Sequence, residues 1–290
     1  CPFHHEKTPS FMVSSTKQIF HCFGCGAGGN VFTFVMKIEN IEFMDAVKIL
    51  SKKSGIEFMD ENYSKSAKEK DEVYNLNEFA AKFYNKILME TKDGLIARDY
   101  LKKRKIQDET INQFKLGFAL NSWDTLISSA LKNGFTVDLL LKTGLIIPKQ
   151  EKQGNYDRFR NRIIFPISDS KNRILGFGAR VLDDSLPKYV NSPDSAIFRK
   201  GDNLYGWNFA KDEALRKGNI VLVEGYFDCI MCHQNGIKNV CAILGTGLTP
   251  INAELIKRYV DKCIILFDVD NAGKESADRG FNILIENGIS

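Results

Sequence analysis

Two short pairs of metal-binding residue types near the start of the chain limit its fold more than any other feature. Cys1 and His4 form one pair, Cys22 and Cys25 form the other, and two residues separate the partners in each. Thiolate and imidazole groups suit tetrahedral Zn²⁺, and four protein ligands leave no open position for a substrate. The sequence therefore predicts one structural Zn²⁺, which organises a segment too small for a conventional core.

The segment between the two pairs predicts a β-hairpin. Its seventeen residues include β-prone runs at 10–13 and 18–23, which would bring the pairs together. His5 and His21 adjoin the predicted ligands and remain alternatives to His4, which is favoured because it repeats the spacing of the cysteine pair. The other interpretation of the four residues is a set of ordinary buried side chains.

The spacing of apolar residues divides the rest of the chain. Helices are expected from about residue 31 and over 43–54, and the polar stretch 62–72 has the composition of a flexible linker. Residues 73–144 have a helical pattern. Strands are expected from residue 145 onward, including 163–167 and 174–177.

The last third alternates strands and helices. Strands are expected at 220–223, 240–244 and 263–267, with a helix after each and Thr249 capping the second helix ahead of Pro250. This order predicts a parallel sheet. The fold class is therefore multidomain α/β and α+β, with a small zinc ribbon, a helical subdomain and a parallel sheet.

Acidic residues follow two of these predicted strands. Glu224 and Gly225 end the first strand, with Asp228 one turn later, and Asp268 and Asp270 end the third. Ligands bind at the carboxyl ends of strands in an open parallel sheet. Alternation along the strand predicts both aspartates on one face, where their oxygens suit Mg²⁺ or Mn²⁺. Alternatively, these acids are solvated caps at strand ends.

Cations are concentrated between residues 158 and 200. Arg158, Arg160 and Arg162 alternate with other residues, which predicts a strand with three arginines on one face. Such side chains can follow the phosphates of a nucleic acid. The alternative is a solvated charged face.

Composition narrows the cellular setting. Lys and Arg number 40 against 36 Asp and Glu, a balance too even to indicate a polyanion partner by itself. Apolar runs stay short of the roughly 18 residues of a membrane span, so no membrane partner is expected.

Seven cysteines without a secretory signal favour a reducing cytosol, and a start at Cys suggests that the sequence begins inside a longer chain. Cys229 and Cys232, on an apolar helix, are interpreted as structural thiols.

Particular strings resemble a known family. CPFHHEKTPSF from Cys1 and KQIFHCFGCG from Lys17 resemble the CHC2 zinc ribbon of DnaG-type primases. VLVEGYFD from Val221 and LFDVD from Leu266 resemble the TOPRIM domain of the same proteins. The intervening strings GFGAR, PKYVNSP and FRKG resemble their RNA polymerase subdomain.

The resemblance implies domains and roles for residues. It implies a zinc-binding domain over 1–61, a linker over 62–72, the first part of an RNA polymerase core over 73–215 and a partial TOPRIM domain over 216–290. It makes Glu224 the acid or base at the reacting hydroxyl, with the three aspartates on the metal side, so that the catalytic set is Glu224, Asp268 and Asp270. The implied magnesium site consists of these three residues and Asp228. Contacts to nucleic acid or nucleotide are expected from Arg158, Arg160, Arg162, Arg180, Lys188, Asn191 and Lys200.

The implied activity is DNA-templated synthesis of short RNA primers in the bacterial cytoplasm. Its partners are single-stranded DNA, ribonucleoside triphosphates and a replicative helicase, which a C-terminal domain outside this chain would contact. The ribbon aromatics Phe11, Phe20 and Phe23 either pack around the metal or stack on template bases. A further acidic motif of the family falls after Ser290, so the metal site within the chain is expected to be incomplete.

Two other functions remain alternatives. A topoisomerase or TOPRIM nuclease explains Glu224, Asp268 and Asp270 but not the ribbon. A single-strand-binding module explains the ribbon and the cations but not the clustered acids.

Overall fold

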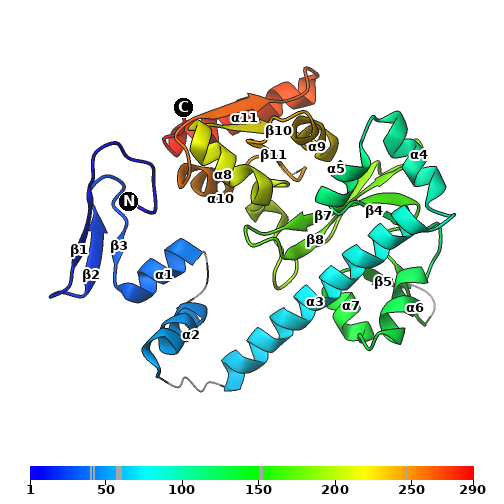
Figure 1. The fold of residues 1–290 in the computed structure, drawn as a ribbon, viewed down its shortest axis with the longest axis horizontal. Helices are drawn as coiled ribbons and strands as arrows, with labels where there is room; N and C mark the ends of the chain where they lie inside the picture. The colour runs from blue at the N-terminus through cyan, green and yellow to red at the C-terminus, as the bar shows by residue number, and fades with distance from the viewer. Residues whose placement is uncertain (40, 42, 57–60, 150–152, 246) are drawn as a thin grey trace.

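The computed structural model describes residues 1–39, 41, 43–56, 61–149, 153–245 and 247–290. Figure 1 shows an N-terminal module, a middle region around an antiparallel sheet, and a C-terminal region around a parallel sheet. The multidomain α/β and α+β class expected from the sequence is confirmed. Among the described residues, no helix has the length and apolar character needed to cross a membrane.

The N-terminal module is the predicted hairpin followed by helices. Its elements are β1 (Phe11–Ser14), β2 (Ile19–Cys22), β3 (Gly28–Gly29), α1 (Val31–Glu39) and α2 (Phe43–Ser54). The strands β1 and β2 pair antiparallel, with Phe11 opposite Cys22. The rings of Phe3, Phe11, Phe20 and Phe34 lie with centroids between 5.4 and 6.1 Å apart. Phe11 and Phe20 therefore pack inside the module, whereas Phe23 is 75% exposed.

The stretch expected as a flexible linker is helical. The long helix α3 (Glu61–Glu90) includes residues 62–72, so the expectation of irregular structure there was wrong. Lys, Glu and Ala are frequent in this stretch, and they are among the residues that favour helix without any buried face. A domain boundary within this helix stays a prediction.

The middle region contains four short helices and two antiparallel sheets. The helices are α4 (Leu95–Lys103), α5 (Asp108–Gln113), α6 (Thr125–Lys132) and α7 (Val137–Lys142). The strands are β4 (Gly117–Ala119), β5 (Ile146–Pro148), β6 (Asn155–Asp157), β7 (Arg162–Ser168), β8 (Ile174–Val181) and β9 (Tyr189–Asn191). Four of them form a sheet in the order β4-β7-β8-β9, and β5 pairs with β6. The three-residue strand β4 interrupts the predicted helical region, because it forms only by pairing with the distant β7.

The C-terminal region is the predicted parallel sheet with its helices. Its elements are η1 (Lys200–Asp202), α8 (Trp207–Lys217), β10 (Ile220–Val223), α9 (Tyr226–Gln234), β11 (Val240–Ala242), α10 (Pro250–Lys257), β12 (Cys263–Leu266) and α11 (Asn271–Glu286). The strand β10 is central and pairs parallel with β11 and β12. Thr249 caps α10 through the amide of Asn252, whose side chain bonds back to the Thr249 amide. The expected helix start is therefore confirmed.

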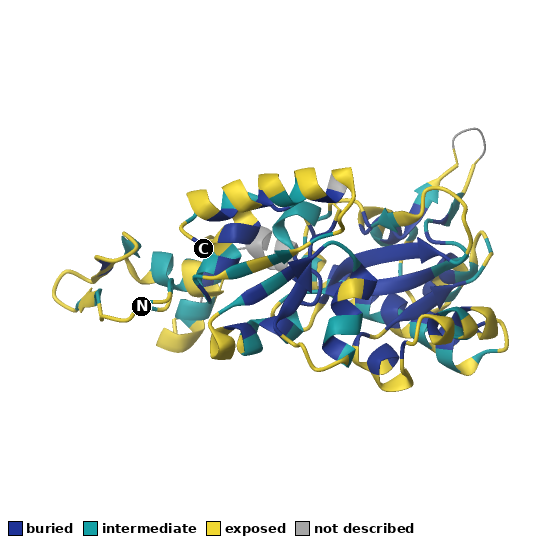
Figure 2. Cartoon of the chain, turned by 90° about the horizontal axis from the view of Figure 1, so that it is seen from above, coloured by how far each residue is buried: buried dark blue, intermediate teal, exposed yellow. Residues whose placement is uncertain are grey.

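One hydrophobic core joins the two sheets. Ile163, Phe165 and Ile167 from β7 share it with Val223 from β10 and Tyr226 from α9. The rings of Phe165 and Tyr226 are stacked, with centroids 4.6 Å apart. Figure 2 shows this central region as the most buried part of the molecule. Because both sheets contribute to one core, their facing edges are fixed relative to each other.

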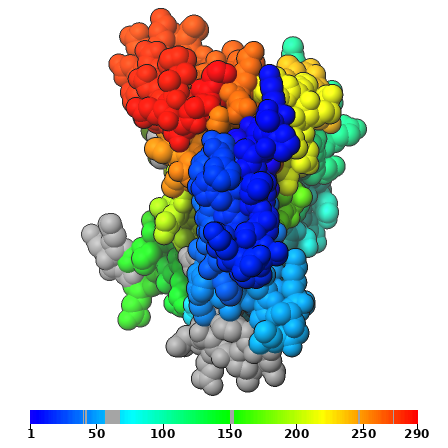
Figure 3. Space-filling view, turned by 90° about the vertical axis from the view of Figure 1, so that its left-hand side faces the viewer, coloured from blue at the N-terminus to red at the C-terminus, as the bar shows by residue number. Residues whose placement is uncertain are grey.

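The N-terminal module contacts the rest of the chain through α1 and α2. The Glu39 carboxylate pairs with the Lys171 ammonium at 2.7 Å, and Arg258 donates to the Lys37 carbonyl at 3.4 Å. A cleft of about 1050 Å³ lies between the module and the core, lined from both sides. Figure 3 shows the blue N-terminal residues alongside the orange and red C-terminal residues. The module is thus held against both the middle and the C-terminal regions by polar contacts, and a further ion pair joins Asp45 of α2 to Lys70 of α3.

The start of α6 depends on a carboxylate from a distant strand. Asp157 accepts hydrogen bonds from the amides of Leu126 at 2.7 Å and Ile127 at 3.0 Å. Asp124 occupies the sequence position of the helix cap but makes no capping bond with its side chain. Burial raises the pKa of Asp157 to about 6, so its carboxyl is ionised at pH 8.

We expect Asp157→Ala to lower the free energy of unfolding by about 1–3 kcal/mol at pH 8, because two buried amides lose their acceptor. Asp124→Ala serves as the control and should change stability by less than about 0.5 kcal/mol, as an exposed side chain with no capping bond. Urea unfolding followed by circular dichroism measures both. Equal losses in the two variants would contradict the assignment of the cap.

Candidate functional site

The four predicted zinc ligands converge at one end of the N-terminal module. The ligand atoms of Cys1, His4, Cys22 and Cys25 all lie within 4.8 Å of one another. The Cys1 and Cys25 sulfurs are 3.9 Å apart, and Nδ1 of His4 is 3.8 Å from the Cys22 sulfur. Two sulfurs bound at about 2.3 Å to a tetrahedral ion lie about 3.8 Å apart, so these distances fit such an ion. The predicted set, with His4 rather than His5 or His21, is the one that the fold brings together.

The loop between Cys22 and Cys25 favours a bound cation. Burial alone would raise the pKa of the Cys22 thiol, but hydrogen bonds from Ser10 and from backbone amides outweigh it and lower the pKa to about 7. A thiol that ionises readily is a better metal ligand. A side chain at Gly24 would meet Ser10 and the His4 ring, so glycine is required for the two halves of the site to approach.

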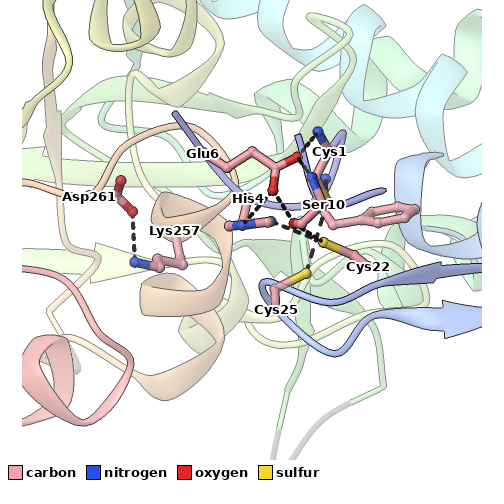
Figure 4. Close-up of polar contacts among 9 residues, drawn as sticks. Cys1, His4, Glu6, Ser10, Cys22, Cys25, Lys257 and Asp261 are labelled. Carbon is pink, nitrogen blue, oxygen red and sulfur yellow. Dashed lines mark hydrogen bonds and ion pairs between the residues drawn. The ribbon is translucent and has the colours of Figure 1, made fainter. Parts of the chain in front are cut away.

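A carboxylate supports this group from outside. Figure 4 shows Glu6 next to His4, with Nε2 of His4 3.4 Å from Oε2 of Glu6. Ser10 lies between Glu6 and Cys22, and its hydroxyl is within hydrogen-bond reach of both. Its amide also donates to Glu6 at 3.2 Å. Residues from both halves of the hairpin are therefore tied to the metal-binding group.

The predicted acids meet at the carboxyl edge of the parallel sheet. Glu224 directly follows β10, and Asp228 lies in the first turn of α9. Asp268 lies just beyond β12, which pairs with β10. A side chain at Gly273 would meet both the Asp268 carbonyl and the Glu224 carboxylate. The backbone of α11 therefore approaches the acids closely because residue 273 is glycine.

The placement of the two later aspartates differs from the prediction. The strand β12 ends at Leu266, so Asp268 and Asp270 lie in the following loop and not on one face of a strand. Asp270 caps α11 by accepting from the Gly273 amide at 2.7 Å. Among the described residues, the acids do not form a group as tight as the Cys/His cluster. Mg²⁺ keeps several of its waters, so looser carboxylates suit it better than a closed cage.

The electrostatics of this edge favour proton uptake by Glu224. Burial raises the pKa of Glu224 above its ordinary value, and the carboxylates of the three aspartates raise it further. Like charges that repel one another in this way attract a cation. A carboxyl with a raised pKa is also a better proton acceptor near neutral pH.

Cations from the middle sheet lie beside these acids. Arg180, on β8, is 8% exposed, and its guanidinium lies 5.5 Å from the centres of the Phe227 and Tyr189 rings. Its Nε and Nη1 atoms have no hydrogen-bond partner among the described residues. Arg104, which follows α4, lies 4.7 Å from the centre of the same Phe227 ring. Two guanidinium groups thus flank the ring that precedes Asp228.

The other residues predicted to contact nucleic acid or nucleotide differ in whether their polar groups already bond within the fold. Lys188 is exposed in the turn before β9, and Lys200 lies against Gly245 in the loop after β11. Asn191 accepts from the Tyr226 hydroxyl at 2.7 Å and donates to the Leu244 carbonyl at 3.1 Å. Both ends of its amide are therefore used within the fold, where they join β9 to the parallel sheet.

The three alternating arginines do not share one strand. Arg158 and Arg160 lie between β6 and β7, and Arg162 is the first residue of β7, so this expectation was wrong. Asn161 has a φ of 50°, which breaks the extended backbone that alternation assumes. Each arginine donates to a backbone carbonyl, Arg158 to Gly144, Arg160 to Asp157 and Arg162 to Pro187.

An aromatic surface beside Arg160 was missed from the sequence. Trp123 is 62% exposed, and the Arg160 guanidinium lies 4.2 Å from its ring centre and 4.9 Å from that of Tyr156. Trp123 precedes α6, whereas Tyr156 lies on β6 and Arg160 follows that strand, so no local pattern predicts the contact with Trp123. An exposed aromatic ring next to a cation is a typical platform for a nucleic-acid base.

Of the two cysteines interpreted as structural thiols, Cys229 is buried and Cys232 is half-buried. Cys229 and Cys241 are buried, and burial raises the pKa of both thiols well above the ordinary value. Among the described residues, neither belongs to a metal-binding group.

Family models match three consecutive parts of the chain. The CHC2 zinc finger matches residues 1–66, the N-terminal domain of the DNA primase catalytic core matches 83–211, and a Toprim-like domain matches 221–290. These regions contain the Cys/His group, the cations and the acids, respectively.

Known proteins match the whole order of domains. A DNA primase of Clostridium acetobutylicum is 48% identical over all of this chain, which covers 48% of that protein. The crystal structure of the zinc-binding and RNA polymerase domains of Aquifex aeolicus primase has a TM-score of 0.70 and 36% identity, over 100% of this chain and 70% of that one. A DnaG primase catalytic domain bound to ssDNA has a TM-score of 0.69 and 34% identity, over 75% of this chain and 67% of that one. The chain spans about half the length of the curated relatives it matches.

Together the fold and the site define a zinc-ribbon protein with a Toprim-type acidic centre on a parallel sheet. Within that class, the chain belongs to the DnaG-type primase family.

Replacing Cys22 or Cys25 with Ser should release about one metal ion per chain and unfold the N-terminal module alone, because the metal organises only that segment. Cys232→Ser, at a half-buried thiol outside the group, is the control and should retain the ion. Elemental analysis and thermal unfolding measure the two effects. An intact protein without bound metal would rule out this site.

Proposed function

We propose that this chain is the template-binding and nucleotidyl-transfer part of a DNA primase, which synthesises short RNA primers on single-stranded DNA. The observation that carries the proposal is the meeting of Glu224 and three aspartates at the carboxyl edge of β10 and β12, beside Arg180 of β8 and Arg104. Relatives named DNA primase support it over the whole chain. A nuclease or topoisomerase would share the acids but would leave the zinc ribbon unexplained.

The acids and cations have complementary roles in this proposal. Glu224 accepts the proton of the attacking hydroxyl, since its raised pKa suits that task. Asp228, Asp268 and Asp270 hold a divalent ion, Mg²⁺ or Mn²⁺, which when bound neutralises charge on the triphosphate. Arg180 and Lys200 approach the same edge of the sheet and bind phosphate oxygens.

The template is proposed to contact the surfaces that expose aromatic rings and cations. Arg160 and Trp123 provide one such surface on the middle region, and Lys188 is an exposed cation in the turn before β9. Phe23 on the zinc ribbon provides another exposed ring. Arg158 and Arg162, whose guanidinium groups already bond to carbonyls, support these loops and add positive charge. Asn191 holds the two sheets together and acts through their geometry.

The proposed ions and partners follow from the same chemistry. The Cys/His group holds one Zn²⁺, because three thiolates and an imidazole at tetrahedral distances suit that ion. Ribonucleoside triphosphates are the substrates, and a replicative helicase is the partner through a region outside this chain. The bacterial relatives support a place in the bacterial cytoplasm.

The decisive experiment is primer synthesis on single-stranded DNA with labelled ribonucleotides, using the full-length protein that contains this chain. Glu224→Gln should lower synthesis by at least about 100-fold, since it removes a proton acceptor at the reacting group. Binding of single-stranded DNA should remain within about twofold of the wild type, because glutamine keeps the side-chain volume and Glu224 is not among the proposed template contacts. Active Glu224→Gln protein would contradict the assigned role, and an inactive wild type with nuclease activity would favour the alternative enzyme class.

Template binding can be tested separately. Trp123→Ala should weaken binding of single-stranded DNA by about 1–3 kcal/mol, the value of one stacked base. Lys188→Ala should weaken binding for all sequences alike and reduce the slope of log K against log salt by about 1. Lys142→Ala is the control, because this exposed lysine pairs with Asp138 on α7. Affinity equal to that of the control would assign both residues to a solvated surface.

A further inference from the structure

The two ring nitrogens of His4 face different groups. Nδ1 lies 3.8 Å from the Cys22 sulfur, on the side of the thiols. Nε2 lies 3.4 Å from Oε2 of Glu6, on the opposite side of the ring. A neutral imidazole carries its proton on one nitrogen and a lone pair on the other, and only the lone pair binds a metal. The direction of the ring therefore decides which tautomer the site needs.

Glu6 is held where it can set that tautomer. Its Oε1 accepts from the nitrogen of Cys1 at 2.7 Å and from the Ser10 amide at 3.2 Å. Its Oε2 faces the Ser10 hydroxyl and Nε2 of His4. The side chains of Glu6 and His4 are only 12% and 13% exposed, so water competes little for this contact. The Ser10 amide and the Ser10 hydroxyl both donate to this carboxylate, which holds the group in place as an acceptor.

Ser10 connects the same carboxylate to the second half of the site. Its hydroxyl is 3.2 Å from the Cys22 sulfur and also reaches Glu6. Gly24 also approaches both the Ser10 hydroxyl and the Nε2 edge of the His4 ring closely, so a side chain at this position would disturb the arrangement. The residues between the two ligand pairs therefore orient the ligands as well as connecting them.

We propose that Glu6 is a positioning residue of the zinc site. Its carboxylate accepts a hydrogen bond from the Nε2–H group of His4, which keeps the proton on Nε2 and directs the Nδ1 lone pair toward the cysteine thiolates. This inference rests on the proposed Zn²⁺ at the Cys/His group. Carboxylates that orient a metal-binding histidine typically change metal affinity by about 10-fold to 100-fold when removed. Ser10 contributes by fixing Glu6 and by its contact with Cys22.

The test compares zinc affinity in three variants of the chain by competition with a chromogenic chelator. Glu6→Ala should lower zinc affinity by about 10-fold to 100-fold. Glu6→Gln should lower zinc affinity less than Glu6→Ala does, because the amide oxygen of glutamine still accepts one hydrogen bond. Some loss should remain, since the NH₂ group of glutamine faces other donors. Glu39→Gln is the matched control, since it removes one negative charge from the same module at an ion pair far from the ligands in sequence. It should retain wild-type affinity.

A second measurement reports the tautomer directly. In zinc-loaded chain labelled with ¹⁵N-histidine, two-bond ¹H–¹⁵N spectra should show His4 with metal on Nδ1 and a proton on Nε2. The His5→Gln and His21→Gln variants assign the signals among the four histidines. In Glu6→Gln the Nε2 proton should exchange faster with water, an effect that a purely structural role for Glu6 would not produce.

The outcomes separate this inference from the proposed function. A wild-type chain that binds no zinc would overturn the zinc site and the inference with it. A zinc-binding wild type whose affinity is unchanged in Glu6→Ala, or equally reduced in Glu39→Gln, would overturn the inference alone. Coordination of zinc through Nε2 of His4 would overturn it as well.

Discussion

The shared core around Tyr226 is the constraint on which the arrangement of the acids and cations depends. Tyr226 follows Glu224 by two residues, stacks on Phe165 of β7 and donates to Asn191 of β9. Gly178 in β8 leaves room for its ring, since any side chain there would meet the tyrosine. The same aromatic contact therefore positions the strand that ends in Glu224 and the sheet that carries Arg180. The rest of the shared core joins the same two sheets, and Tyr226 is a member of it that lies next to the acids.

The two metal-binding regions are built on opposite principles. The Cys/His group is closed, with four ligand atoms within 4.8 Å and a surrounding set of donors that fixes their directions. The acids form an open edge, in which Asp270 also caps a helix, and among the described residues they are less tightly grouped than the Cys/His ligands. A closed site stabilises a small module, whereas an open one leaves coordination positions for phosphate and water. These differences match a structural role for the first and a chemical role for the second.

Polar contacts join the zinc module to the core, whereas buried apolar contacts join the two sheets. Its contacts through α1 are an ion pair and a bond to a carbonyl, around a sizeable cleft, whereas the sheets share buried aromatic rings. Exposed ion pairs contribute little to stability and weaken with salt. The module is therefore held in its position far less firmly than the acids and cations are held in theirs.

The sequence by itself determined the elements that depend on local pattern. The Cys/His group follows from paired spacing, the parallel sheet from alternating strands and helices, and the α10 start from Thr249 and Pro250. Only the tertiary structure decided the contacts between distant segments. Asp157 caps α6, Arg160 lies on Trp123, and β4 forms by pairing with β7. It also placed Arg158 and Arg160 outside a strand and residues 62–72 inside a helix. Periodicity records which face of an element is buried, but it carries no information on which distant partner supplies a hydrogen bond or a ring.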